Sequence, residues 1–233
     1  MNNYALEQAE ELFEQALEYF LGIEKEKNMI HAKELLQQSS ELGLSKSSNL
    51  LGDWYIKKII PGDNYKEAFK LYTRGYEFGD MRSFSRLAMC YEKGYGIKKD
   101  IPKALELYEK SVELGNKDAC FSIARIYEKG ENIKMDLSKA ILWYKRGYEK
   151  GDADCACNLA TCYYKGKGIE QNIEKAKEIF LAFSEYNTQN QRNLGVIFYK
   201  GTPSCKPNEE EAIYWFTKAA NNGDITSMLH LGK

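Results

Sequence analysis

Apolar residues recur three and four positions apart along most of the chain, in stretches separated by short polar segments. Two such stretches, at 119–127 and 140–148, lie between Gly115 and Gly151. This spacing is typical of amphipathic helices, which bury one apolar stripe. Asp136 comes shortly before the second stretch, where we expect its side chain to accept a hydrogen bond from a free backbone amide. The segment therefore predicts two helices joined by a short loop.

The same pattern returns every 36 residues in three series of positions. Small residues in the second helix of each unit are expected to let neighbouring helices approach closely: Ala32, Ala68, Ala104, Ala140, Ala176 and Ala212. The expected N-caps stand four residues earlier: Asn28, Asn64, Asp100, Asp136, Asn172 and Asn208. The expected left-handed ends of the second helices are Gly43, Gly79, Gly115, Gly151 and Gly223. Asn187 fills the one missing glycine position, and asparagine also adopts the left-handed conformation.

These series predict the fold class and the domain organisation together. One pair of amphipathic helices cannot bury both faces alone, so adjacent units must stack. We predict an all-α fold, a right-handed α/α superhelix (solenoid) of about six 36-residue helix-turn-helix repeats. The repeats form a single predicted domain over 1–233, with units at about 1–43, 44–79, 80–115, 116–151, 152–187 and 188–223, and a partial unit at 224–233.

Charge and hydropathy exclude several classes of protein. The chain has 33 Lys and Arg against 34 Asp and Glu, a net charge of -1, whereas a dedicated nucleic-acid binder needs a positive excess. No apolar run approaches the roughly 18 residues of a membrane helix. Residues 1–30 are too acidic and too interrupted for a secretory signal. We therefore expect a cytoplasmic protein that binds neither nucleic acid nor membranes.

The residue types that carry chemistry form no convincing site. Cys155 and Cys157 point about 200° apart on a helix, so they cannot converge on one metal ion, and the cysteines are expected to be buried structural thiols. His31 and His230 lie at opposite ends of the chain. Paired carboxylates remain available, but no spacing singles out a pair. We expect no catalytic residue, metal or cofactor.

Two further patterns have ordinary structural explanations. The glycine pairs at 94–96 and 166–168 lack the preceding strand and the Gly-Lys-Ser/Thr of a phosphate-binding loop, which favours turns between helices. Lysines end the first helix of five units: Lys57, Lys93, Lys129, Lys165 and Lys200. They complement the helix dipole, and they also form a candidate basic ladder for acidic partner segments. Both interpretations stay open.

The third unit carries the clearest resemblance to a known family. It contains Leu87-Ala88-x-x-Tyr91-x-x-Gly94-x-Gly96-Ile97-x-x-Asp100-x-x-x-Ala104-x-x-x-Tyr108 and closes with Gly115. This run resembles the Sel-one-like repeat, a relative of the tetratricopeptide repeat. The resemblance implies an α/α superhelix that serves as a scaffold or adaptor for protein partners, without chemistry of its own. The second unit departs from the pattern, with Lys58 at the place of the loop glycine.

In solenoids of this kind, the first helix of each pair lines the concave face. The predicted partner-binding residues are the first-helix positions left free of the core: Asn49, Asp53, Arg82, Ser85, Met89, Phe121, Arg125, Thr161, Tyr164, Arg192, Val196 and Tyr199, with Lys46, Asp118 and Cys157 on the same face. They vary between units, and they include the aromatic and arginine residues that are enriched in binding hot spots. An ordinary solvated helix face is the competing interpretation.

The preferred functional hypothesis is a non-catalytic protein–protein interaction scaffold that binds a protein or peptide partner in its concave groove, with an inhibitor or immunity-type protein as one form. One alternative is a hydrolase acting on cell-wall or β-lactam substrates, as proposed for secreted relatives. The other is a structural homo-oligomer, because Ser227 and Leu231 match the start of another unit and the half repeat at 224–233 offers a surface for self-association.

Overall fold

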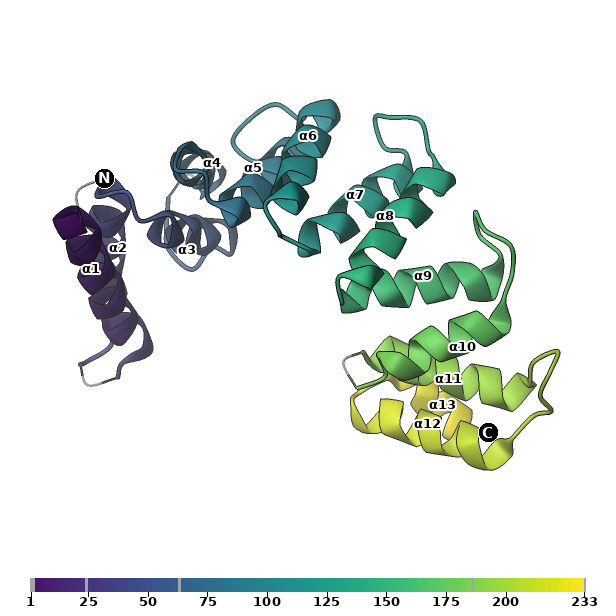
Figure 1. Cartoon of the computed structure of the whole chain (residues 1–233). Helices are drawn as coiled ribbons and strands as arrows, with labels where there is room; N and C mark the ends of the chain where they lie inside the picture. The colour runs from purple at the N-terminus through teal and green to yellow at the C-terminus, as the bar shows by residue number, and fades with distance from the viewer. Residues whose placement is uncertain (1–2, 24, 63, 186, 233) are drawn as a thin grey trace. The chain divides into compact units, whose positions relative to one another are not determined.

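The computed structural model describes residues 3–23, 25–62, 64–185 and 187–232 (Figure 1). In these ranges the chain forms thirteen α-helices and no strand, with a single isolated bridge between Thr202 and Cys205. The predicted all-α class and the helix-pair repeats are therefore confirmed. Among the described residues, no helix is both long enough and apolar enough to cross a membrane.

The chain divides into two compact units, Met1–Ala119 and Cys120–Lys233. The first contains α1 (Asn3–Leu21), α2 (Met29–Glu41), α3 (Ser45–Ile56), α4 (Asn64–Glu77), α5 (Met81–Lys93) and α6 (Ile101–Glu113). Helix α7 (Asp118–Lys129) leads into the second, followed by α8 (Leu137–Glu149), α9 (Ala153–Lys165), α10 (Ile173–Ala182), α11 (Thr188–Lys200), α12 (Glu209–Asn221) and α13 (Ile225–Leu231). The predicted single domain over 1–233 stays a prediction, and each unit is described by itself.

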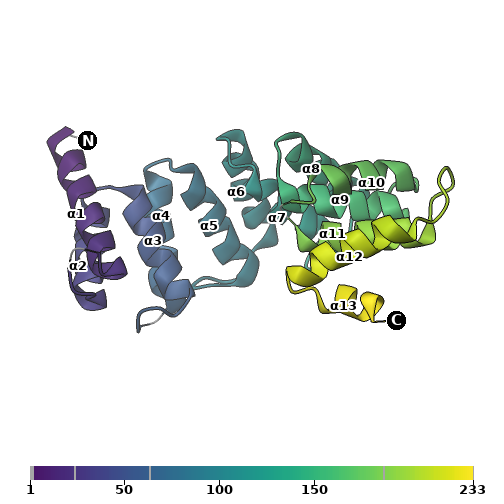
Figure 2. The same cartoon turned by 90° about the horizontal axis from the view of Figure 1, so that it is seen from below.

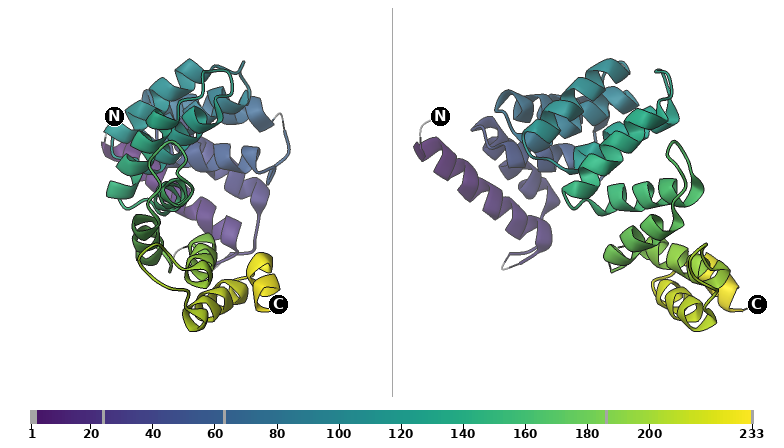
Figure 3. Two further views of the ribbon diagram at one scale, coloured as in Figure 1. Left: turned by 90° about the vertical axis from the view of Figure 1, so that its right-hand side faces the viewer. Right: turned by 45° about the vertical axis from the view of Figure 1, so that its right-hand side comes forward.

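Within each unit, consecutive helices pack as hairpins. In the first unit α1 packs on α2, α3 on α4 and α5 on α6 (Figure 2). In the second unit α9 packs on α10 and α11 on α12, and α13 lies against α12 (Figure 3). The six periodic alanines are at most 2% exposed. Their small side chains therefore lie in the packed interior between helices, as the sequence predicts.

Five of the six predicted N-caps are confirmed by their hydrogen bonds. The side chains of Asn28, Asp100, Asp136, Asn172 and Asn208 each accept from the backbone N–H three residues later. Asn64 is the exception, because it is itself the first residue of α4 and its Oδ1 is buried without a hydrogen-bond partner. The cap prediction was therefore wrong at Asn64 only.

The prediction of a left-handed Asn187 was also wrong. The five periodic glycines have positive φ, but Asn187 has φ -150° and ψ 112°, and its side chain caps α11 by accepting from the N–H groups of Gln189 and Asn190. The cause is a missing residue in this unit, where α10 already ends at Ala182. The deletion moves Asn187 out of register with the glycines and into the capping position.

Lys58 occupies the loop position where later units have glycine, and it adopts the left-handed conformation with φ 56°. A side chain costs about 1 kcal/mol in this conformation, so Lys58→Gly is expected to stabilise the first unit by about 0.5–1 kcal/mol. A higher urea midpoint in circular dichroism is the expected result. The control is Lys57→Gly, whose φ of -79° needs no glycine and which should lower the midpoint. A lower midpoint for Lys58→Gly would contradict the inference that the backbone at Lys58 is strained.

The cysteines divide into two environments. Cys90, Cys120, Cys155, Cys157 and Cys162 are buried free thiols, as predicted. Cys157 is only 3% exposed, so its placement on the binding face was wrong. Cys205 is exposed in the loop after α11, so the prediction of a buried thiol was wrong there. This loop carries the one-residue insertion of its unit and lies outside the repeated core. Thr202 and Ser204 of the same loop donate hydrogen bonds to the carboxylate of Glu174.

Thiol reactivity should follow this division. Burial raises the pKa of Cys90 to about 12 and that of Cys157 to about 11, so neither forms a thiolate near neutral pH. A disulfide reagent such as Ellman's is expected to modify one thiol in the native chain and all six in denaturant. In Cys205→Ser the native signal should vanish while five thiols still react in denaturant. Rapid native modification of two or more thiols would contradict the assignment.

Candidate partner-binding site

A hollow of about 420 Å³ lies on the first unit where side chains of α1, α3 and α5 meet. Its lining consists of Phe13, Lys46, Asn49, Leu50, Asp53, Asp80, Met81, Arg82 and Arg86. Among these, Lys46, Asn49, Asp53 and Arg82 belong to the predicted binding face. Ser85 and Met89 are half-buried on α5 and are not part of the lining. The sequence therefore identified two of the three helices that form the hollow and missed α1.

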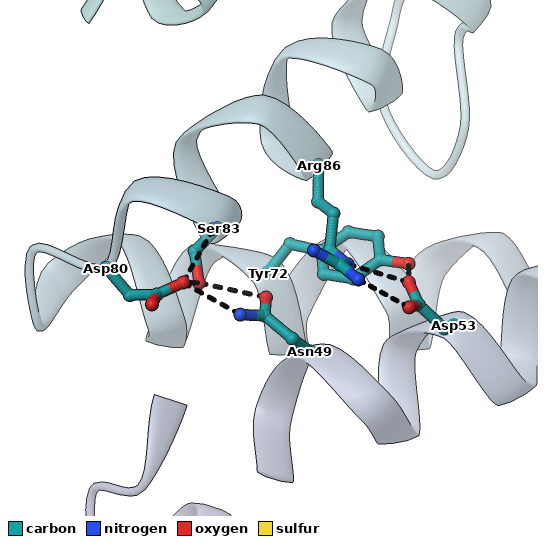
Figure 4. Close-up of polar contacts among 6 residues, drawn as sticks. All are labelled: Asn49, Asp53, Tyr72, Asp80, Ser83 and Arg86. Atoms are coloured by element: carbon teal, nitrogen blue, oxygen red, sulfur yellow. Dashed lines mark hydrogen bonds and ion pairs between the residues drawn. The ribbon is translucent and has the colours of Figure 1, made fainter. Parts of the chain in front are cut away.

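One side of the hollow is built on a carboxylate that joins two neighbouring repeats (Figure 4). Asp53 of α3 accepts two hydrogen bonds from Arg86 of α5, at 2.8 Å from Nε and 2.6 Å from Nη2. The Tyr72 hydroxyl donates a third, at 2.7 Å to Oδ1. Burial, reinforced by the charge of Asp53, raises the pKa of Tyr72, so its hydroxyl stays protonated and donates. This bidentate geometry fixes the Arg86 guanidinium in place.

A second cluster orders the start of α5. Asp80 caps this helix, with Oδ2 accepting from the Ser83 N–H and from the Ser83 hydroxyl, each at 2.8 Å. Asn49 of α3 donates to the same Oδ2 at 2.8 Å, and its own Oδ1 accepts from Ser83 Oγ at 2.9 Å. Asn49 is only 4% exposed. Its role in the structure is therefore to tie α3 to α5, rather than to stand free on the surface.

The rim of the hollow carries exposed cations. Lys46 Nζ lies 4.8 Å from the centre of the Phe13 ring and 3.7 Å from the Glu10 carboxylate, with nearly half of its side chain exposed. Arg82 is exposed and makes no hydrogen bond or ion pair to any residue that the structure describes. Met81 beside it is 36% exposed. The rim thus combines positive charge with apolar surface.

The predicted residues of the second unit are in several different environments. The Arg125 guanidinium lies 5.6 Å from the Phe121 ring centre, so these two form one surface pair. The Thr161 hydroxyl donates to the backbone oxygen of Cys157 in its own helix at 2.8 Å. Arg192 forms an ion pair with Asp224 at 2.9 Å. The remaining predicted positions are half-buried or exposed: Tyr164, Val196 and Tyr199.

The periodic lysines lie where a role at the helix ends would place them. The five periodic lysines stand at or next to the ends of α3, α5, α7, α9 and α11, and all are exposed. They can therefore complement the helix dipoles, while the basic-ladder interpretation stays untested. Within the described ranges, no three His, Cys, Asp or Glu side chains are placed to hold a metal ion.

Helix hairpins that recur every 36 residues, with capping residues and buried alanines at fixed places, define an α-helical repeat protein. The Sel1 repeat matches six stretches of the chain, at residues 12–44, 47–80, 85–116, 117–152, 153–184 and 191–224. The chain belongs to the Sel1 repeat family, which confirms the resemblance seen in the sequence. Sel1 repeats generally serve as scaffolds for protein interactions.

Solved structures show the same fold. A Sel1 repeat protein from Oxalobacter formigenes is 25% identical, with a TM-score of 0.82 over 92% of this chain and 88% of that one. A protective antigen of uropathogenic Escherichia coli is 23% identical, with a TM-score of 0.70 over 96% of this chain and 56% of that one. An immunity protein from Pseudomonas aeruginosa is 18% identical, with a TM-score of 0.58 over 94% of this chain and 84% of that one. A comparison with curated proteins finds no match.

Proposed function

We propose that this chain is a non-catalytic interaction scaffold that binds a protein or peptide through the first helices of its repeats. The observation that carries the proposal is the hollow of the first unit, because first helices α3 and α5 supply most of its lining. Exposed arginine and lysine side chains stand beside aromatic and apolar ones there, a composition enriched at protein interfaces.

An inhibitor or immunity-type role is one form of this function. The Pseudomonas aeruginosa protein with the same fold is named as an immunity protein. A scaffold that masks a toxin and a scaffold that joins two cellular proteins would use the same kind of surface. The proposal therefore covers both forms, and its test asks whether a partner binds to the first-helix surface.

The hydrolase alternative finds less support in the structure. The His31 ring packs edge-on against the Tyr19 ring, and the His230 ring stacks on the Phe216 ring, with ring centres 4.6 Å apart in both pairs. In the described ranges, no side-chain hydrogen bond joins either histidine to a serine, threonine or cysteine, as it would for the base of a nucleophilic site. The cysteine thiols other than Cys205 are buried. These environments favour a structural role for the residue types that a hydrolase would use.

The homo-oligomer alternative rests on α13. Ile225 is 72% exposed and Leu229 is 62% exposed, so this short helix presents an apolar face. Light scattering at two concentrations distinguishes the alternatives. A constant monomer mass would exclude self-association, and a mass that rises with concentration and returns to the monomer value in Ile225→Ser/Leu229→Ser would support it.

The proposed function is tested by capture of protein partners on the immobilised full chain. Lys46→Ala/Arg82→Ala alters the rim of the hollow, and Phe121→Ala/Arg125→Ala alters the half-buried pair on α7. A partner retained by the unaltered chain is expected to fall at least about tenfold with one of these variants, since removal of hot-spot side chains costs about 1–3 kcal/mol.

Matched controls remove exposed side chains elsewhere on the same units. Lys98→Ala/Lys110→Ala takes two cations from the first unit, and Leu142→Ala/Lys150→Ala takes one apolar side chain and one cation from the second. Partner recovery should be unchanged in both. Equal recovery with all four variants would show that the first-helix face is not the binding surface.

A further inference from the structure

The hollow of the first unit presents hydrogen-bond donors on its rim, while three of its four carboxylate oxygens already accept hydrogen bonds. We infer that it binds an acidic peptide segment, with a carboxylate contacted by Lys46 and Arg82 and a neighbouring apolar side chain against Phe13, Leu50 and Met81. This inference rests on the proposed function and specifies the chemistry of the partner at one site.

The two carboxylates of the hollow have limited capacity for further donors. Asp53 accepts three hydrogen bonds, one from Tyr72 and two from Arg86. Asp80 accepts on Oδ2, from Asn49, from the Ser83 N–H and from the Ser83 hydroxyl, whose one proton is shared with Asn49 Oδ1. Of the four carboxylate oxygens, Oδ1 of Asp80 is the one without a hydrogen bond to a described residue. A basic ligand would meet this one oxygen and three cations, so the charge of the hollow disfavours it.

The cationic side chains of the hollow, in contrast, have N–H groups left for a ligand. Arg82 has no polar partner in the described part of the chain, and Lys46 has only a long contact of 3.7 Å to exposed Glu10. Arg86 uses Nε and Nη2 on Asp53, which leaves the N–H groups of Nη1 for another acceptor. Three cations and two carboxylates line the hollow. An incoming carboxylate can therefore gain charge-assisted hydrogen bonds while competing only with the long, exposed Lys46–Glu10 contact.

The apolar part of the lining favours a peptide over a bare anion. Phe13, Leu50 and Met81 line the same hollow as the cations. The hollow volume of about 420 Å³ lies within the 300–1,000 Å³ typical of ligand sites. An anion alone would leave this apolar surface in water, whereas a leucine, methionine or aromatic residue beside an aspartate or glutamate would cover it.

The site is also held in shape before a ligand arrives. The bidentate Asp53–Arg86 pair and the Asn49–Asp80 bond connect α3 to α5 on one side of the hollow (Figure 4). Because these side chains are already ordered, a ligand meets a lower entropic cost on binding.

The experiment is selection of random dodecapeptides displayed on phage against the immobilised full chain. We expect recovered peptides to be enriched in aspartate and glutamate next to leucine, methionine or aromatic residues. A selected peptide, labelled with fluorescein, should bind at least about tenfold more weakly to Lys46→Ala/Arg82→Ala, since charge-assisted hydrogen bonds are lost. Its affinity should also fall as salt is raised.

The control variant Lys98→Ala/Lys110→Ala removes two exposed cations outside the hollow and outside the periodic lysines, changes the net charge equally, and should bind the peptide as the unaltered chain does. Replacing the acidic residues of the peptide by their amides should weaken binding as much as the rim variant does. Selected peptides without acidic enrichment, no selected peptide at all, or equal weakening in both variants would overturn the inference. So would equally tight binding of an oligothymidylate of twelve nucleotides. Loss of partner capture through Phe121→Ala/Arg125→Ala would still support the proposed function in each of these cases.

Discussion

Gly96→Ala is expected to lower the free energy of unfolding of the first unit by about 3 kcal/mol. An added Cβ would lie 2.3 Å from the backbone oxygen of Tyr65 and 2.8 Å from Cα of Lys66, at the start of α4. These neighbours are backbone atoms of a helix, so they cannot turn away as the end of a side chain can. Gly96 also has φ +72°, and the overlap and the left-handed conformation each cost about 1–2 kcal/mol or more.

The matched control separates the two causes. Gly79 has φ +74°, but no atom lies within 4 Å of an added Cβ. Gly79→Ala should therefore cost only the conformational part, about 1 kcal/mol. Urea unfolding followed by circular dichroism measures both variants. Equal losses in the two would show that the loop at Gly96 does not lie against α4 as described.

Asp53→Ala is expected to destabilise the first unit by about 2–3 kcal/mol. The substitution removes the acceptor of three hydrogen bonds and leaves the largely buried Arg86 guanidinium and the Tyr72 hydroxyl without it. Breaking one side of a fully buried pair costs about 3–5 kcal/mol, and this pair is about a quarter exposed, which lowers the expected loss. Urea unfolding of the full chain measures it.

Two controls test whether the loss comes from this cluster. Glu109→Ala removes a carboxylate from an exposed position of α6 and should change stability by less than about 0.5 kcal/mol. Asp53→Ala/Arg86→Ala should be less destabilising than the sum of its single substitutions, with a coupling of about 1–3 kcal/mol. Additive losses would mean that Asp53 and Arg86 act independently and do not tie α3 to α5.

The helix hairpins could be predicted because the alanine and N-cap signals each recur six times at intervals of 36 residues. The alanines and five of the caps fall where the 36-residue period places them. The predictions were wrong where a unit loses a residue (Asn187), where it gains one (Cys205), and where the expected cap lies inside the helix (Asn64). Asn187 was matched to glycines by its distance along the chain, while the shorter α10 moves it into the capping position of α11. An N-cap side chain accepts hydrogen bonds from the backbone N–H groups at the start of a helix, so the place where that helix begins matters more than the period.

The candidate site could be predicted only in part. Lys46, Asp53 and Arg82 were found because they lie on the first-helix face that the period leaves outside the core. Arg86 was missed because its partner Asp53 is 33 residues away and belongs to the neighbouring hairpin. Only the stacking of the two hairpins brings them together. The sequence does contain one signal for Arg86: it is charged, whereas the equivalent positions of other units hold uncharged residues, Leu50, Ser122 and Asn158.

Phe13 and Asn49 show two further limits. Phe13 lies on α1, outside the positions from which the binding face was predicted, although it lines the hollow. Asn49 lies on the predicted face but is buried by its bonds to Asp80 and Ser83. Helical periodicity gives the direction of a side chain, whereas its hydrogen-bond partners depend on how closely the helices pack.

The most direct test of the binding surface is site-specific photocrosslinking in the full chain. Benzoylphenylalanine in place of Met81 would stand on the rim of the hollow and leave its cations in place, and in place of Lys98 it would stand on an exposed loop outside the hollow. The account predicts that irradiation links a captured protein partner or a selected peptide through position 81 and not through position 98. Adducts through position 98 alone, or in equal yield at both positions, would contradict it.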